Sequence, residues 1–578
     1  MNISRRHFLK KTSFLLSTIA IATMTAAGKT NTSGQNILFI SIDDLNDWIS
    51  CLGGHPQART PNIDRLASRG MLFKNAHCAV PACGPSRGAV FTGLQPWKTG
   101  NHSNGDKNAL KKIGREFNTL PQTLRKAGYN TFGAGKLLHG NINQYPIKEM
   151  FTDYGPKYEK WLPFTDKEIH YTENELNASD DKSVVKRHVN RGTGKLQVTL
   201  PLNDMPRERN LASKRIDSFD WGGLPVDDSE MGDYQTTEWA VNQLKKKQEK
   251  PFFLGVGIYR PHIPLYVPQK YYELFPPEIV QLPTVKENDL SDLPRVARDF
   301  ALKEYTAGTH KNVVKHDQWR QAVSCYLACI AFVDAQIGRL LDVLDAGPYR
   351  DNTAIVLWSD HGWHLGEKEH WGKYTGWERS TRVPLIIVPP GNSQAAYKTG
   401  RTCDQLVSLI DLYPTVLDLI NMPRNDQLDG KSLVPLLKNP KSGLSEYVLT
   451  SFGRGNHTVR TLNWRYTRYY EGSEELYDVI HDPYEFDNLA SLSPYTHVKQ
   501  ELKRKLPAYE QIDYFVSMKY WKAVIYKDKT RTELFDLKDN RAIPEDENVS
   551  SSHPEVIENM LRYIREHHIQ EKFVSIPD

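Results

Sequence analysis

Short, almost wholly apolar runs alternate with longer amphipathic stretches through most of the chain. The run ILFISI at residues 37–42 is nearly continuous in apolar side chains, as in a parallel strand that is covered on both faces. Further apolar runs at 129–134, 251–258 and 354–358 follow helical stretches, the longest of which is 318–345. This alternation predicts an α/β fold: a large, mostly parallel sheet sandwiched by helices.

Ionisable residues follow these strands closely. Asp43 and Asp44 come directly after the first run, Lys136 and His262 after the next two, and Asp360 after the last. In open α/β sheets, ligands bind beyond the carboxyl ends of the strands. We therefore expect these five side chains to lie on one rim of the sheet.

Residues 1–27 have the three-part layout of an export signal. SRRHFLK at 4–10 matches the twin-arginine pattern, an apolar run follows at 14–22, and small residues near 25–27 form a cleavage zone. The apolar run is too short for a stable membrane span. We expect export to a bacterial periplasm or beyond it, with an N-terminal membrane anchor as the alternative.

The end of the chain contains a weak internal repeat. WRY leads to ELYD within residues 464–478, and WKA leads to ELFD within 521–536. Each copy has the pattern of a hairpin, a turn and a helix start. The repeat predicts a smaller C-terminal α+β domain with an antiparallel sheet at 445–578, after a catalytic domain at 28–444.

Composition excludes several classes of protein. The 578 residues are 39% hydrophobic and 25% charged, which is typical of a globular protein, and the net charge of +5 is too diffuse for a nucleic-acid binder. Six cysteines are too few for a disulfide scaffold. Cys325 and Cys329 share one face of a predicted helix and are expected to be buried, whereas Cys51, Cys78 and Cys403 could pair after export.

The most specific pattern is CGPSR at residues 83–87, followed by TG at 92–93. It resembles the signature of the formylglycine-dependent sulfatases of the alkaline phosphatase-like superfamily. The resemblance implies that a separate maturation enzyme oxidises Cys83 to 3-oxoalanine (formylglycine) and that Arg87 helps to hold it. The alternative is a buried or disulfide-bonded cysteine at a turn before a helix.

A hydrated aldehyde explains why such a modification suits sulfate esters. It carries two hydroxyl groups on one carbon, of which one attacks sulfur and forms a covalent sulfo-enzyme. The other, once deprotonated, expels sulfate by restoring the aldehyde. One difficult step is thereby split into two.

The family resemblance also implies a divalent cation. Asp43, Asp44, Asp360 and His361 supply oxygen donors and one imidazole nitrogen, which suit Ca²⁺ or Mg²⁺. The resemblance favours Ca²⁺, which the formylglycine oxygen at Cys83 would also coordinate. His361 stands where many sulfatases carry asparagine. Paired acids after a strand can instead cap a helix.

Four further residues match family positions. Lys136 and Lys373 would bind the sulfate oxygens, where fixed positive charge is a large catalytic contribution. His262, with Lys373, would protonate the leaving alkoxide, and His139 would take the proton from the second hydroxyl during sulfate release.

Three short segments look most like the iduronate-2-sulfatase branch: GKLLH at 135–139, PHIP at 261–264 and SDHGW at 359–363. Relatives in this branch act on sulfated uronic acids of glycosaminoglycans or on marine polysaccharides such as ulvan and carrageenan. We therefore expect a carbohydrate sulfatase. The alternatives are an aryl or choline sulfatase, a phosphonate or phosphate ester hydrolase on the same scaffold, and a non-catalytic protein that binds sulfated glycans.

Two long, weakly patterned stretches, 141–233 and 276–316, are expected to form lids or binding walls. The first contains charged and aromatic residues suited to gripping sulfated sugars: Lys182, Arg187, Arg191 and Trp221. Surface decoration is the alternative for each of them.

Overall fold

The computed structural model describes residues 34–140, 142–157, 168–171, 185–189, 196–199, 202–203, 205, 219–303, 308–391, 396–507, 512–518, 521–526, 532–536, 554–566 and 573–575. The predicted export signal at 1–27 lies outside these ranges. Within them, no helix combines the length and the apolarity that crossing a bilayer requires.

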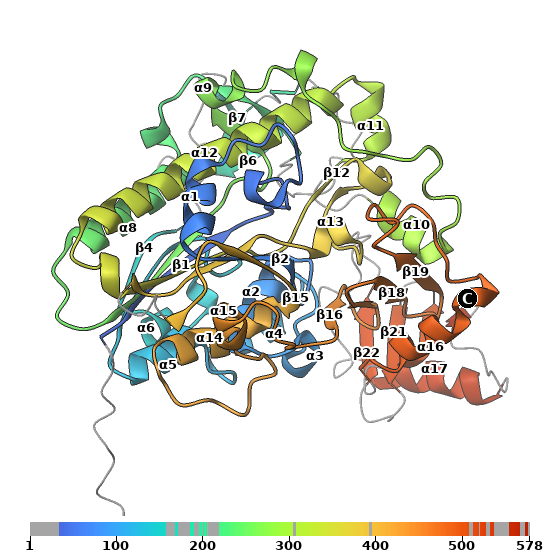
Figure 1. The fold of residues 1–578 in the computed structure, drawn as a ribbon. Coiled ribbons are helices and arrows are strands. Elements are labelled where there is room, and N and C mark those ends of the chain that lie inside the picture. Colours follow the sequence, from blue (N-terminus) through green and yellow to red (C-terminus); the bar gives the residue numbers. More distant parts are fainter. Residues whose placement is uncertain are drawn as a thin grey trace, which may run out of the picture.

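An eight-stranded sheet forms the centre of the molecule (Figure 1). In spatial order its strands are β15 (Arg401–Ser408), β2 (Met71–His77), β14 (Leu385–Val388), β11 (Thr353–Ser359), β1 (Asn36–Ile42), β9 (Phe252–Ile258), β3 (Asn130–Gly135) and β4 (Asp153–Lys157). Only β14 runs against its neighbours β11 and β2; the other pairs are parallel. The predicted mostly parallel sheet is confirmed.

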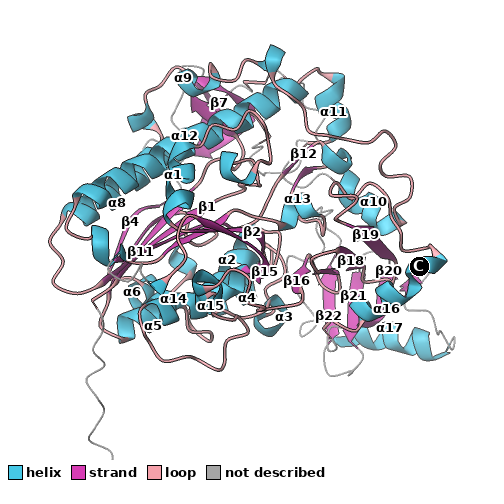
Figure 2. Cartoon of the chain, in the orientation of Figure 1, coloured by secondary structure: helices cyan, strands magenta, loops and turns pink. Residues whose placement is uncertain are grey.

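Helices cover both faces of this sheet (Figure 2). Side chains alternate across a strand, so Leu38 and Ile40 of β1 enter one core while Ile37 and Phe39 enter the other. The helices of the first core are α1 (Pro61–Arg69), α8 (Gly232–Lys245) and α12 (Trp319–Ala346). Those of the second are α2 (Cys83–Thr92), α5 (Leu120–Lys126) and α14 (Leu412–Leu419). Burial on both faces explains why β1 is apolar along its whole length.

All six cysteines are free thiols. Cys325 and Cys329 are buried on α12, as predicted. Cys51, Cys78 and Cys403, which could have paired, form no disulfide. The fold is therefore held without covalent cross-links.

Two four-stranded sheets follow the part of the chain that forms the central sheet. The first contains the antiparallel strands β16 (Val448–Ser451), β17 (His457–Arg460), β18 (Trp464–Arg468) and β19 (Glu474–Asp478), followed by α16 (Thr496–Lys503). The second contains β20 (Ile512–Met518), β21 (Trp521–Tyr526), β22 (Thr532–Asp536) and β23 (Phe573–Ser575), with α17 (Pro554–Glu566) between the last two strands. An α+β region with antiparallel sheet at the end of the chain is thus confirmed.

The sequence repeat corresponds to a structural repeat. In the first copy, β18 and β19 pair with Trp464 opposite Asp478; in the second, β21 and β22 pair with Trp521 opposite Asp536. A helix follows each hairpin. The exact boundary between 28–444 and 445–578 stays a prediction.

Buried arginines tie the first C-terminal sheet to the part of the chain that forms the central sheet. Arg465 of β18 is fully buried; it donates to the carbonyl oxygen of Gly376 at 2.7 Å and pairs with the carboxylates of Glu378 and Glu485. Arg460 of β17 also reaches Glu378, at 3.2 Å. Because these charges lie away from water, each depends on its partners.

We expect Arg465→Met to lower the free energy of unfolding by about 3–5 kcal/mol, because it leaves buried carboxylates without their cation. Urea unfolding followed by tryptophan fluorescence measures the loss. Arg65→Met is the control, because its pair with Asp342 is exposed (37% and 67%) and such pairs contribute about 0–1 kcal/mol. Equal losses in the two variants would contradict the structural role of Arg465.

Candidate functional site

The ends of neighbouring parallel strands place the predicted residues in one row. Asp43 follows β1, and its N–H donates to the carbonyl of Ile258 in β9 at 3.1 Å. Asp360 follows β11, and its N–H donates to the carbonyl of Ile42 at 3.2 Å. Lys136 follows β3 on the other side of β9. The hydrogen-bond pattern of the sheet thus continues into the site and fixes the spacing of its members.

The carboxylate of Asp44 points toward the side chains of this row. Its φ of 61° is left-handed, a conformation that costs a residue with a side chain about 1–3 kcal/mol. Oδ1 lies 2.6 Å from Nζ of Lys373, and Oδ2 lies 3.8 Å from Nε2 of His262. Oδ2 is buried and has no hydrogen-bond partner among the described residues. Strain and an unsatisfied buried oxygen together indicate a functional role.

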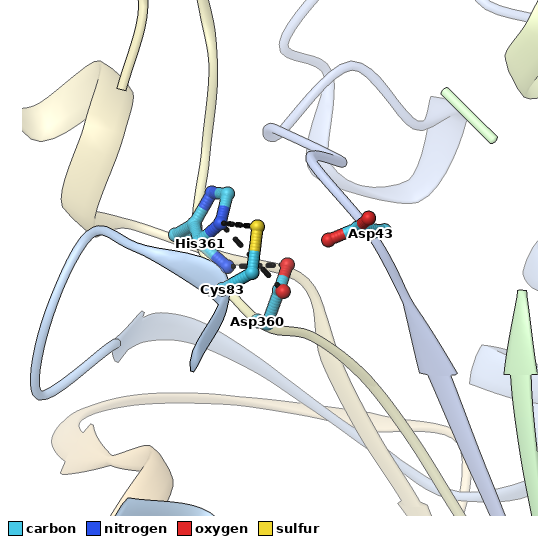
Figure 3. Close-up of side chains that lie close together, drawn as sticks. All are labelled: Asp43, Cys83, Asp360 and His361. Atoms are coloured by element: carbon cyan, nitrogen blue, oxygen red, sulfur yellow. Dashed lines mark hydrogen bonds and ion pairs between the residues drawn. The ribbon is translucent and has the colours of Figure 1, made fainter. Parts of the chain in front are cut away.

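Cys83 is the first residue of α2, and three nitrogens surround its sulfur atom. Nζ of Lys373 lies 2.9 Å from Sγ, Nε2 of His361 lies 3.3 Å away and Nζ of Lys136 lies 3.8 Å away. Figure 3 shows Sγ between the His361 ring and the two carboxylates of Asp43 and Asp360. The predicted nucleophile, sulfate-binding lysines and metal ligands therefore come together at the start of one helix.

Arg87, one turn further along α2, holds the carboxylates. Its Nε donates to Asp360 at 2.8 Å, its Nη2 donates to Asp43 at 3.3 Å, and its Nη1 donates to the carbonyl of Lys136. Ser86 Oγ donates to the backbone carbonyl of Asp360 at 2.6 Å. The described hydrogen bonds of Arg87 thus go to the strand ends, and the predicted contact with formylglycine stays a prediction.

Two overlapping groups of side chains have the geometry to hold a metal ion. In each group, one ligand atom per residue lies within 4.8 Å of all the others. The groups are Asp43, Cys83, Asp360 and His361, and Asp43, Asp44, Cys83 and His262. The three carboxylates of these groups are hard donors that fit Ca²⁺ or Mg²⁺, whereas the imidazole nitrogens are borderline donors.

His361 is oriented for such a role. Its Nδ1 lies 3.0 Å from the carbonyl of Gly362, which requires the proton to be on Nδ1 in the neutral ring. Nε2 faces carboxylate oxygens of Asp44 and Asp360 at 3.5 and 3.6 Å. Burial lowers the pKa of the ring, but the Asp360 carboxylate outweighs this effect and raises the pKa above its ordinary value. A divalent cation bound between them would take the place of the proton that these carboxylates favour on Nε2.

Buried charges shift the protonation of the site. Burial alone would raise the pKa of the Cys83 thiol, but Lys136, Lys373 and a neighbouring imidazole hold it well below its ordinary value. Burial raises the pKa of the Asp360 carboxyl to about 7 against the attraction of Arg87. The site therefore favours negative charge at the end of the Cys83 side chain.

The two predicted acid–base histidines flank the sulfur. His139 shares a side-chain hydrogen bond with Cys83, and burial lowers its pKa, which keeps the ring neutral near pH 7. Nδ1 of His262 lies 2.7 Å from the carbonyl of Ile263, so Nε2 faces the site, next to Asp44. His262 is 14% exposed, which places it at the mouth of the site.

The sequence did not reveal Asp233, a buried residue in the first turn of α8. Its Oδ1 accepts the N–H of Tyr259 at 2.7 Å, and its Oδ2 accepts the N–H of Arg260 at 3.0 Å. These two residues begin the turn that carries His262. In the sequence, Asp233 is indistinguishable from an ordinary acidic residue at a helix start.

One predicted glycan contact is wrong. Trp221 is fully buried in β8 (Trp221–Leu224), and its Nε1 donates to Gln318 at 3.0 Å. Its large apolar ring packs in the core, so it cannot grip a sugar. Lys182 and Arg191 lie outside the described residues, and the side chain of Arg187 does too.

Known proteins are similar to this chain in sequence and in fold. A family model described as "Sulfatase" matches residues 35–422, and one described as "N-sulphoglucosamine sulphohydrolase, C-terminal" matches 366–512. The chain belongs to the sulfatase family and is a sulfuric ester hydrolase.

Individual relatives cover most of the chain. A "Sulfatase" of Formosa agariphila is 35% identical over 479 residues, which span 82% of this chain and 86% of the relative. Iduronate 2-sulfatase of Mus musculus is 32% identical over 451 residues, spanning 71% of this chain and 73% of the relative. The solved phosphonate monoester hydrolase of Agrobacterium radiobacter has a similar fold, with a TM-score of 0.61, 22% identity and coverage of 82% of this chain and 94% of that one.

We expect Asp233→Ala to destabilise the turn that carries His262, because two backbone N–H groups lose their acceptor at about 1–3 kcal/mol each. Asp233→Asn keeps one acceptor oxygen and should lose less. Urea unfolding ranks the three proteins, and sulfate release well below the unfolding midpoint should follow the same order. Full activity in Asp233→Ala would show that His262 does not depend on this clamp.

Proposed function

We propose that the protein hydrolyses sulfate esters of a carbohydrate through a formylglycine formed from Cys83. The main support is that side-chain nitrogens of Lys373, His361 and Lys136 lie close to Sγ of this residue. The structure contains the encoded cysteine, so Sγ stands in for the aldehyde oxygen. Once formed and hydrated, the aldehyde supplies one hydroxyl that attacks sulfur and a second whose deprotonation releases sulfate.

Lys136 and Lys373 are suited to bind the sulfate group. Both are buried, and each reaches Sγ of Cys83 as well as a carboxylate that fixes its position. The start of α2 adds the partial positive charge of a helix N-terminus. Preorganised positive charge of this kind stabilises the anionic oxygens as the S–O bond breaks.

We further propose that Asp43, Asp44, Asp360 and His361 hold a divalent cation, with Ca²⁺ the expected ion. Their donor chemistry and the unsatisfied oxygen of Asp44 support this assignment. When bound, the cation supplies positive charge that polarises an S–O bond and balances the carboxylates. Arg87 keeps two of these carboxylates aimed at the cluster.

The histidines divide the proton transfers. His262, at the mouth, is suited to protonate the departing alkoxide together with Lys373, because an alkoxide leaves poorly without a proton. His139, held against Cys83 and neutral, is suited to accept the proton of the second hydroxyl. The two proton transfers thus use separate groups, one at the mouth of the site and one against Cys83.

For the substrate we propose a sulfated uronic acid or a related sugar of a polysaccharide such as ulvan, carrageenan or a glycosaminoglycan. The similarity to iduronate 2-sulfatase and the motifs at 135–139, 261–264 and 359–363 support this choice. The predicted signal at 1–27 supports twin-arginine export to the periplasm or beyond. A formylglycine-forming maturation enzyme would have to act before export.

We expect Cys83→Ala to reduce sulfate release by more than about 10³-fold, as for loss of a catalytic nucleophile, while the unfolding midpoint stays close to that of the native protein. Sulfate released from a panel of sulfated oligosaccharides and aryl sulfates is the measurement, with phosphonate esters tested beside them. Cys51→Ser serves as the control. Retained turnover in Cys83→Ala, or an unmodified Cys83 peptide in active protein by mass spectrometry, would refute the mechanism.

We expect Asp43→Asn to lose the tightly bound cation, because the substitution removes a charged ligand but preserves the side-chain shape. Calcium and magnesium per chain, measured by elemental mass spectrometry after gel filtration, give the result. Asp342→Asn, on the surface, should keep the metal content of the native protein. Unchanged calcium in Asp43→Asn would exclude this carboxylate as a ligand.

A further inference from the structure

A loop that the sequence left unassigned, residues 101–106, presses against the start of α2. Oδ1 of Asn104 accepts the N–H of Gly84 at 2.7 Å. Ala82, which precedes the helix, offers no side-chain cap. Asn104 therefore supplies from another segment the acceptor that a capping residue would normally provide. The helix turn that begins with Cys83 is fixed by a side chain twenty residues away in sequence.

Glycine is required next to Cys83 for this contact. A Cβ atom at Gly84 would lie 2.9 Å from Oδ1 of Asn104 and 3.4 Å from Cβ of His139. One helical turn later, a Cβ atom at Gly88 would lie 2.8 Å from Nδ2 of Asn101. The two glycines lie on one face of α2. Because this face carries no side chain at either position, the loop can pack closely against the helix.

The amide of Asn104 also reaches the other side of the site. Its Nδ2 donates to Oη of Tyr374 at 2.7 Å. Tyr374 directly follows Lys373, has a left-handed backbone with φ of 73°, and donates its N–H to the carbonyl of Pro81 at 3.0 Å. Asn104 thus contacts the neighbour of the nucleophile and the neighbour of the lysine that lies 2.9 Å from it.

The loop is held in turn by the C-terminal sheet. Oδ2 of Asp106 accepts the N–H groups of His102 and Ser103 at 2.7 and 2.8 Å. Its Oδ1 pairs with Nη2 of Arg454 at 3.0 Å, and both side chains are only 7% exposed. Arg454 lies in the turn between β16 and β17. A buried ion pair therefore connects the C-terminal sheet to the loop that carries Asn104.

We propose that Asn104 is a positioning residue that fixes Cys83 relative to Lys373, and that Arg454 holds Asn104 in place through Asp106. The consequence for catalysis rests on the proposed function, but the consequence for geometry does not. Fixed charges act on a transition state only if they are held in place, and a displacement near 1 Å can cost about 10²-fold in rate. Asn104 touches no reacting group itself.

Crystal structures of the encoded-cysteine forms test the geometry. In Asn104→Ala we expect Tyr374 to move and the Lys373 Nζ to Cys83 Sγ distance to increase by about 1 Å, the scale at which rates fall about 10²-fold. Asn488→Ala is the matched control, because Asn488 also accepts backbone N–H groups, those of Leu476 and Ala490, but lies in the C-terminal region. An unchanged distance in Asn104→Ala would overturn the proposal.

Kinetics of the matured proteins test the consequence, with formylglycine content measured by mass spectrometry to correct for maturation. We expect Asn104→Ala to lower kcat about 10–100-fold. The loss should be larger for phenyl sulfate than for 4-nitrophenyl sulfate, because the poorer leaving group depends more on the proton that Lys373 helps to deliver. Asn488→Ala should affect both esters little. Equal losses for both esters, or a loss no greater than in Asn488→Ala, would contradict the positioning role.

Three further variants test the individual contacts. Tyr374→Phe removes the acceptor of Nδ2, and Asn104→Asp keeps the cap but removes the donor, so both should show the same leaving-group pattern as Asn104→Ala with a smaller loss. Arg454→Met should add little to Asn104→Ala if the two act in series. Independent, additive losses would exclude Arg454 from the chain of contacts.

Native protein that releases no sulfate would overturn the proposed function, while the crystal structures would still decide the positioning role.

Discussion

Three carboxylates and three basic side chains share one buried pocket, and neither set would be stable there without the other. An unpaired ion taken out of water costs several kcal/mol even after the protein relaxes. The pocket avoids this cost by pairing each charge with at least one of the opposite sign. The groups are Asp43, Asp44, Asp360, Arg87, Lys136 and Lys373. Because the charges are matched, a divalent cation added to them creates a positive surplus, which suits an anionic ester. Strands β1, β3 and β11 and helix α2 each contribute a member of this set.

The sequence predicted this arrangement where local pattern determines position. Buried parallel strands appear as continuous apolar runs, and the residue after each strand lies on the same rim, so Asp43, Lys136 and Asp360 could be placed together before their contacts were known. The prediction for Cys83 came instead from the resemblance of CGPSR to the sulfatase signature. The repeat was also visible, because hairpins keep their register through fixed positions such as Trp464 and Asp478.

What the sequence could not supply are contacts between distant segments made by ordinary residue types. Asp233, Asn104 and Arg454 belong to no motif, and an acidic residue at a helix start or an asparagine in a loop has many unremarkable roles. Their partners lie 26, 270 and 348 residues away, at distances that only the fold determines. Trp221 is an error of the opposite kind. Tryptophan often binds sugars, so Trp221 was expected in a sugar-binding wall, but it is a core residue, which its sequence allows equally well.

The absence of disulfides bears on where this protein can acquire its structure. Six free thiols, five of them buried, mean that nothing in the fold waits for an oxidising environment. The native state is accessible in a reducing compartment. There the thiol of Cys83 forms no disulfide and stays available for the proposed conversion. The proposed maturation and export can therefore follow folding as separate events, and a defect in one need not alter the chemistry of the others.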